Sequence, residues 1–141
     1  MVDEEEGEEN HPELWMRFME GVGCTKVSLQ PKLDGRINLV EGFFELVKTD
    51  YPTGLGALYA YERQTPEVSA SKIEGLSKHY GIKDQRALQF FTVHQKADEW
   101  HVEELVGLIN KMSESDKQKV SDGANAGAKY LWSFLDGVYT T

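Results

Sequence analysis

The chain has 141 residues, a net charge of −9, 40% apolar residues and a single cysteine. This length and apolar content predict one globular domain over residues 1–141, and the absence of an apolar run of roughly 18 residues argues against a membrane span. The sequence contains no cluster of basic residues, so nucleic acid is not an expected partner. The single cysteine, Cys24, cannot form an internal disulfide, so the reducing cytoplasm is the expected compartment.

The first two predicted elements are helices. Residues 10–23 begin with Asn10, a good N-cap residue, and carry Pro12 in the first turn, followed by apolar residues at helical spacing. A second helical stripe spans residues 37–52, and we expect it to end near Pro52.

The third predicted helix covers residues 55–79. Two members of its apolar face are unusual, because Glu62 places an acid there and Pro66 follows one turn later. A proline inside a helix removes a backbone donor, so we expect Pro66 to kink this helix and to free the carbonyl of Glu62.

The fourth and fifth predicted helices cover residues 84–112 and 116–139. Both have apolar residues at helical spacing, and no strand pattern or internal repeat is present. The sequence therefore predicts an all-α fold of about five helices.

Three polar side chains interrupt the apolar stripe of the fourth helix. His94, Asp98 and His101 stand at i, i+4 and i+7, in series with apolar residues such as Leu88 and Leu105. At about 100° per residue they fall within roughly 60° of one another around the helix axis. Burying such groups without partners costs several kcal/mol, so a bound metal ion is the simplest way to satisfy them.

Glu62 and His11 add two more candidate ligands on predicted inward faces. Carboxylates and imidazoles that converge in a helical bundle are typical of di-iron and di-manganese sites, and oxygen and nitrogen donors suit those metals. Simpler explanations exist for each residue alone. His11 could be a hydrogen-bonded core histidine, Glu62 could cap the kink at Pro66, and the trio on the fourth helix could be a solvated ridge.

Four segments of the chain carry a family resemblance. They are DEEEGEENHPELW at residues 3–15, ALYAYERQTP at 57–66, FTVHQKADEWH at 91–101 and LWSFLDG at 131–137. The sequence resembles the CADD-like branch of the TENA/THI-4/PqqC superfamily. This resemblance implies a haem-oxygenase-like helical bundle, and a non-haem di-metal oxidase that activates O2 to attack a small-molecule substrate.

The resemblance also implies the ligands of two iron ions, with manganese as an alternative metal. The first of these ligands is Glu4. Glu5 and Glu6 are alternatives to it, because the match to the family pattern is not fixed to a single residue within the acidic segment. Carried over position by position, the six ligands are Glu4, His11, Glu62, His94, Asp98 and His101.

Two further positions match residues near the family's site. Lys72 matches a lysine associated with p-aminobenzoate formation, which links the chain to folate synthesis, and Tyr61 matches an aromatic residue beside the site. Ordinary explanations are a solvent-facing lysine and a packing tyrosine. Phe90 stands where the CADD type has a tyrosine.

The chain departs from the family at its front. Family members begin with two further helices that pack over the site, so the sequence predicts an N-terminally truncated, partial domain with exposed apolar surface. The resemblance also favours a homodimer.

Two alternatives to the di-iron oxidase stay open. One is a PqqC- or TENA-like enzyme of cofactor biosynthesis that acts without a metal. The other is a non-catalytic, truncated interaction module that keeps the ligands as an inherited pattern.

Overall fold

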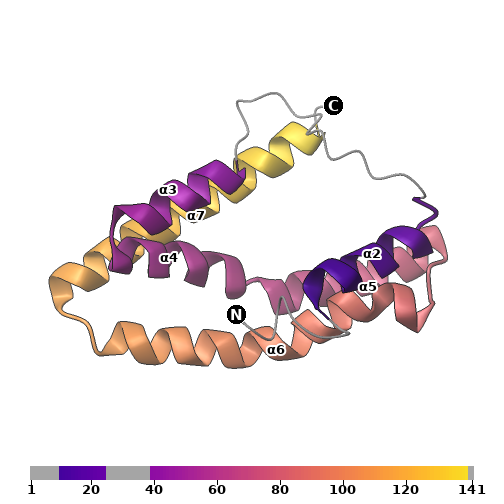
Figure 1. Ribbon diagram of the computed structural model, residues 1–141, viewed down its shortest axis with the longest axis horizontal. Coiled ribbons are helices and arrows are strands. Elements are labelled where there is room, and N and C mark those ends of the chain that lie inside the picture. Colours follow the sequence, from indigo (N-terminus) through magenta and orange to yellow (C-terminus); the bar gives the residue numbers. More distant parts are fainter. Residues whose placement is uncertain (1–9, 25–38, 140–141) are drawn as a thin grey trace. The chain divides into compact units, whose positions relative to one another are not determined.

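The computed structural model describes residues 10–24 and 39–139, apart from the side chains of residues 96–99. Every regular element in these two ranges is an α-helix, which confirms the all-α prediction (Figure 1). The helices are α2 (His11–Gly21), α3 (Leu39–Thr49), α4 (Tyr51–Glu62), α5 (Thr65–Tyr80), α6 (Gln85–Asn110) and α7 (Glu114–Tyr139).

The chain divides into two compact units, and both contain part of α6. Unit 1 comprises Met1–Leu29 and Thr65–Asp98, and unit 2 comprises Gln30–Gln64 and Glu99–Thr141. The prediction of one domain over residues 1–141 stays a prediction. Each unit is described below by itself.

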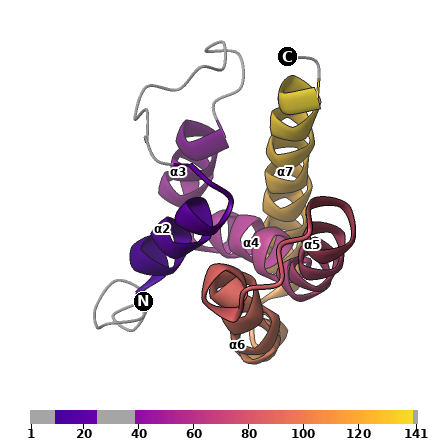
Figure 2. The same ribbon diagram turned by 90° about the vertical axis from the view of Figure 1, so that its right-hand side faces the viewer.

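In unit 1, α2 packs on the first half of α6 (Figure 2). Leu14 of α2 is completely buried, and the ring of Phe18 meets Phe91 edge-on at a centroid distance of 5.0 Å. Gly21 lies so close to Ala87 that a side chain at position 21 would overlap it. Apolar burial and a close approach at a small residue therefore hold α2 against α6.

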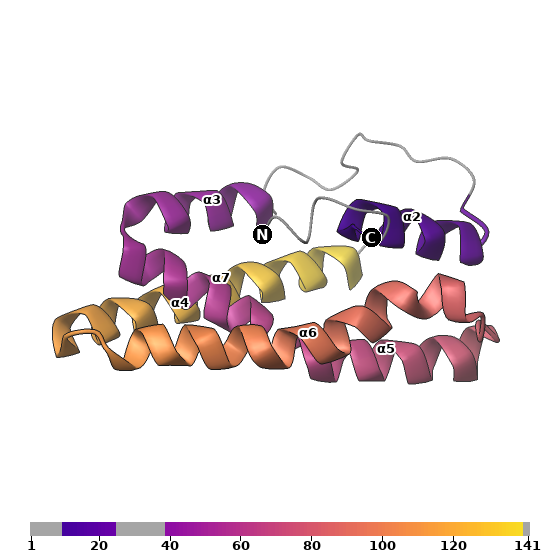
Figure 3. The same ribbon diagram turned by 60° about the horizontal axis from the view of Figure 1, so that its bottom comes forward.

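In unit 2, α4 packs against α7 and α3 contacts both (Figure 3). The interface between α4 and α7 is lined by glycines. A Cβ atom on Gly56 would overlap the carbonyl of Val120, and one on Gly123 would overlap the carbonyl of Thr53. The missing side chains let the two helix backbones approach closely.

The structure corrects two predicted helix boundaries. The second predicted helix ends at Thr49 rather than near Pro52, because Asp50 accepts a hydrogen bond from the Thr53 amide and starts α4. Pro52 then lies in the first turn of α4, where its missing N–H removes no helical bond.

The third predicted helix, residues 55–79, is two helices. Pro66 does not kink a continuous helix. Instead α4 ends at Glu62, and α5 begins at Thr65 with Pro66 as its second residue. Proline is tolerated in the first turn of a helix and disfavoured in its interior, so ending one helix and starting another is the favoured outcome.

Burial confirms the predicted inward stripe of α6 in part. Leu88, Phe91, His94 and Leu105 are all buried. In α7, by contrast, the same helical spacing predicts that Trp132, Leu135 and Val138 face inward, and all three are exposed. The close contacts of α7 lie earlier in the helix, at Val120, Gly123, Gly127 and Tyr130, which is why periodicity alone misassigned its last turns.

Asp50 also gives unit 2 a pH-dependent contact. Its side chain accepts a 2.9 Å hydrogen bond from the Thr53 amide and lies 3.4 Å from Lys119 Nζ. The hydrogen bonds from Thr53, and then the Lys119 ammonium, lower the pKa of Asp50 below its ordinary value of 3.8. A carboxyl whose pKa is lowered by folding stabilises the folded chain above that ordinary value, and this contribution is lost as the pH falls through the folded pKa.

We therefore expect Asp50→Asn, which keeps the capping acceptor and loses the charge, to unfold at lower urea than the wild type at pH 6. The gap between the two midpoints should narrow as the pH is lowered to 3, because the wild-type carboxylate then becomes protonated. Asp122→Asn removes an equal charge from an exposed position on α7 and serves as the control. A gap for Asp50→Asn that stays constant with pH would contradict this assignment.

Candidate metal centre

Two of the predicted ligands meet in unit 1. Asn10 accepts a hydrogen bond from the Glu13 amide and so fixes the start of α2, which places His11 in the first turn. The His11 ring lies 4.2 Å from the His94 ring, centroid to centroid, with 46° between the ring planes. Residues that are far apart in sequence thus bring two imidazoles into direct contact.

The environment of His94 determines which ring nitrogen can bind a metal. His94 is only 9% exposed, and its Nδ1 lies 2.6 Å from the carbonyl oxygen of Phe90, one turn earlier in α6. A carbonyl only accepts hydrogen bonds, so Nδ1 must carry the proton and donate it. The neutral ring then has its lone pair on Nε2. Metal-bound histidines are oriented in the same way, so His94 fits the role of a ligand.

Two further predicted ligands meet in unit 2. Glu62 is the last residue of α4, and its Oε2 lies 3.7 Å from Nδ1 of His101 in α6. Both side chains are partly buried. A carboxylate and an imidazole at this distance form an ion pair when the histidine is protonated, and they provide one oxygen and one nitrogen donor when it is neutral.

The remaining predicted ligands fall outside the description. Glu4 and the alternatives Glu5 and Glu6 lie before residue 10, outside the described residues. Asp98 is part of helix α6, but its side chain is not among those that the structure describes. Within the described ranges, no three His, Cys, Asp or Glu residues gather in a group that could hold a metal ion. The structure therefore gives two pairs of candidate ligands, one in each unit.

The two other predicted site residues lie on different elements. Tyr61 is in the last turn of α4, where its ring meets Phe43 of α3 edge-on at 6.1 Å. Lys72 is exposed on α5.

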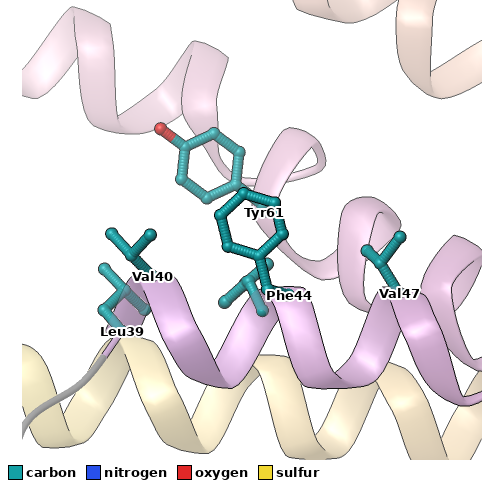
Figure 4. A pocket seen from close by; sticks show the side chains of 6 residues that line it. Leu39, Val40, Phe44, Val47 and Tyr61 are labelled. Atoms are coloured by element: carbon teal, nitrogen blue, oxygen red, sulfur yellow. The ribbon is translucent and has the colours of Figure 1, made fainter.

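An apolar groove in unit 2 was not predicted from the sequence. It has a volume of about 390 Å³, and Tyr61 contributes to its wall (Figure 4). The signal was present, because α3 has apolar residues on two adjacent faces, and only one of them is needed against α4 and α7. The α3 residues that line the groove are Leu39, Val40, Phe43, Phe44 and Val47.

Comparison with known proteins gives one family and several relatives. The model of a family described as "Iron-containing redox enzyme" matches residues 1–132. The chain is 38% identical to a 4-aminobenzoate synthase of Nitrosomonas europaea, over 99% of this chain and 58% of that protein. It is 30% identical to a 4-aminobenzoate synthase of Chlamydia trachomatis, over 96% of this chain and 60% of that protein.

A 4-aminobenzoate synthase of Chlamydia pneumoniae is 34% identical over 96% of this chain, and 62% of that protein is covered. The chain therefore spans about three fifths of the length of the curated relatives it matches.

None of the helices within residues 10–24 and 39–139 combines the length and apolar character that a membrane crossing requires.

Proposed function

Because this chain belongs to the haem-oxygenase-like family of iron-containing redox enzymes, we propose that it is a non-haem di-iron oxidase that activates O2 in the formation of 4-aminobenzoate. The observation that carries this proposal is the hydrogen bond from His94 Nδ1 to the Phe90 carbonyl, which leaves Nε2 of a buried imidazole available to iron. Relatives named 4-aminobenzoate synthase support the product.

The six proposed ligands comprise three imidazoles and three carboxylates, which contribute differently to metal binding. The imidazoles of His11, His94 and His101 supply neutral nitrogen donors, and the carboxylates offset the charge of the metal and favour its oxidised states. Bound iron would supply the electrons that reduce O2. The carboxylate ligands in this proposal are Glu4, Glu62 and Asp98.

Other groups of the chain orient a ligand, exclude water and face the substrate. The Phe90 carbonyl holds the proton on His94 Nδ1 and fixes the ring. Burial of His94 excludes water from its side of the site, which strengthens the electrostatic interactions there. Tyr61 and Lys72 are the proposed substrate-side residues. Tyr61 precedes a ligand and borders the groove, and Lys72 offers an amine from α5.

The partners in this proposal are O2 and a small-molecule substrate, in the cytoplasm, with the chain acting as a homodimer. The same oxygen and nitrogen donors accept manganese. Metal loading should therefore compare Fe(II) with Mn(II).

The test is anaerobic loading of the chain with Fe(II), followed by removal of unbound metal, metal analysis and addition of O2. We expect close to two irons per chain, iron-dependent uptake of O2, and 4-aminobenzoate detectable by mass spectrometry. A His94→Ala/His101→Ala double variant should lose the iron and the uptake. Wild-type protein that retains no iron above background would overturn the proposal.

A further inference from the structure

A series of contacts defines how α2 lies along the first half of α6. Residues at the start of α2 contact the later part of this half of α6, and residues at the end of α2 contact its beginning, so the two helices run antiparallel. The contacting pairs are His11 with His94, Trp15 with Phe90 and Gly21 with Ala87. His11 is at one end of the series, so any sliding of α2 along α6 would separate its imidazole from that of His94.

Apolar burial alone holds α2 weakly in this position. The helix has 11 residues, all of them described, and Leu14 is the one residue among them that is buried. A helix shorter than roughly 12–15 residues is marginal in water without tertiary contacts. The position of α2 therefore depends on further contacts with α6.

Arg17 provides such a contact between the two helices. Its Nη1 donates a 3.0 Å hydrogen bond to Oε1 of Gln89 in α6, and its Nε donates a 3.1 Å hydrogen bond to Oε1 of Glu13, one turn earlier in α2. The Arg17 side chain is only 18% exposed. Because the donors of a guanidinium have a fixed planar geometry, the bond to Glu13 orients the group that reaches Gln89.

We propose that Arg17 and Gln89 are positioning residues, an inference that rests on the proposed function. Their hydrogen bond fixes the register of α2 on α6 and so holds the imidazole of His11 beside that of His94, where both can bind iron. Arginine has no acceptor atom and cannot itself be a ligand. The effect of the pair on iron therefore acts through His11.

A second polar contact between the same helices serves as the comparison. Arg86 of α6 donates a 2.9 Å hydrogen bond to Oε2 of Glu20 in α2, and the two side chains are 57% and 59% exposed. Exposed ion pairs contribute little, because water and salt screen them. We therefore expect Glu20→Gln to leave both the position of His11 and the iron affinity unchanged.

The first experiment tests the positioning without iron. In the metal-free full chain, the carbon-bound ring protons of His11 and His94 should give a nuclear Overhauser effect, since their rings are 4.2 Å apart. Gln89→Leu removes the acceptor at similar size and should lose this signal. Gln89→Glu keeps an Oε1 acceptor and makes the hydrogen bond charge-assisted, so it should restore the signal. Far-UV circular dichroism checks that each variant is folded.

The second experiment measures anaerobic Fe(II) affinity by equilibrium dialysis. Groups that only orient a ligand affect metal affinity by roughly 10–100-fold, so we expect a loss of this size in Gln89→Leu and recovery in Gln89→Glu. Arg17→Met should match Gln89→Leu. The double variant should be no weaker than either single variant, because both remove the same hydrogen bond.

The two readouts separate this inference from the proposed function. A ring-proton signal that persists in Gln89→Leu would overturn the positioning, with or without iron. Equal iron affinities for Gln89→Leu and the wild type, or equal losses in Gln89→Leu and Glu20→Gln, would overturn it while leaving the iron site intact. Wild-type protein that binds no iron would overturn the proposed function, and the metal-free signal would still report whether Gln89 holds His11 beside His94.

Discussion

Replacing Gly56 with alanine is expected to destabilise the chain by roughly 1–3 kcal/mol, the range typical of overpacking in a close-packed interior. The added Cβ would overlap the backbone carbonyl of Val120 in α7 and approach the amide of Ala124. A backbone group cannot rotate away as a side chain can, so α4 and α7 would have to separate. Urea unfolding followed by circular dichroism would measure the loss.

Gly107→Ala is the matched control in the same unit. Gly107 is also in a helix, but a Cβ there meets nothing within 4 Å. Alanine is favoured over glycine in a helix by about 1 kcal/mol, so this variant should be more stable than the wild type. If Gly56→Ala were also stabilising, α4 and α7 would not be packed as closely as described.

The second large effect is expected from His94→Ala, which should weaken iron binding by more than about 100-fold. Residues that only orient a metal ligand contribute roughly 10–100-fold to affinity, and the loss of a ligand itself should exceed this range. Equilibrium dialysis with Fe(II) under anaerobic conditions measures the change. Far-UV circular dichroism verifies that the variant has kept its helices.

His79→Ala provides the comparison for this experiment. His79 is exposed in the last turn of α5, so its removal takes away one imidazole without touching the proposed site. Iron affinity should be the same as in the wild type. Equal affinities for His94→Ala and wild type would show that His94 is not a ligand, whatever its buried position.

Much of the fold follows from periodicity. The apolar spacing of α6 and α7 predicted both helices to within a few residues of their observed bounds, since long amphipathic helices carry the clearest signal. The buried stripe of α6 at Leu88, Phe91 and Leu105 followed from the same spacing.

Both helix boundaries that differ from the prediction involve a proline, a residue that can end one helix or begin the next. The sequence predicts that one helix ends near Pro52, whereas Pro52 lies in the first turn of the next helix, because Asp50 provides the cap. The sequence predicts a kink at Pro66, whereas this proline lies at the start of a new helix, α5. Proline fits both situations locally. Tertiary packing decides between them, and a single sequence does not contain that information directly.

The spacing of residues in the sequence predicted only part of the candidate site. The i, i+4, i+7 pattern selected His94 on one helix, but its contact with His11 and the 3.7 Å separation of Glu62 and His101 join elements distant in sequence. The indole of Trp15 beside Phe90 was not predicted at all. An aromatic residue at helical spacing is normally interpreted as core, and its exposure depends on which helices cover it.

The glycine-lined contact between α4 and α7 also has a consequence during translation. A ribosome completes α4 at Glu62 and must then make all of α5 and α6 before α7 begins at Glu114. At roughly 5–20 residues per second this takes several seconds, during which the face of α4 that carries Gly56 has no α7 to pack against. The helices α5 and α6 are adjacent in the chain and are free to associate during that interval. Unit 2 is therefore assembled last, and slower elongation lengthens the time for which the nascent chain leaves this face uncovered.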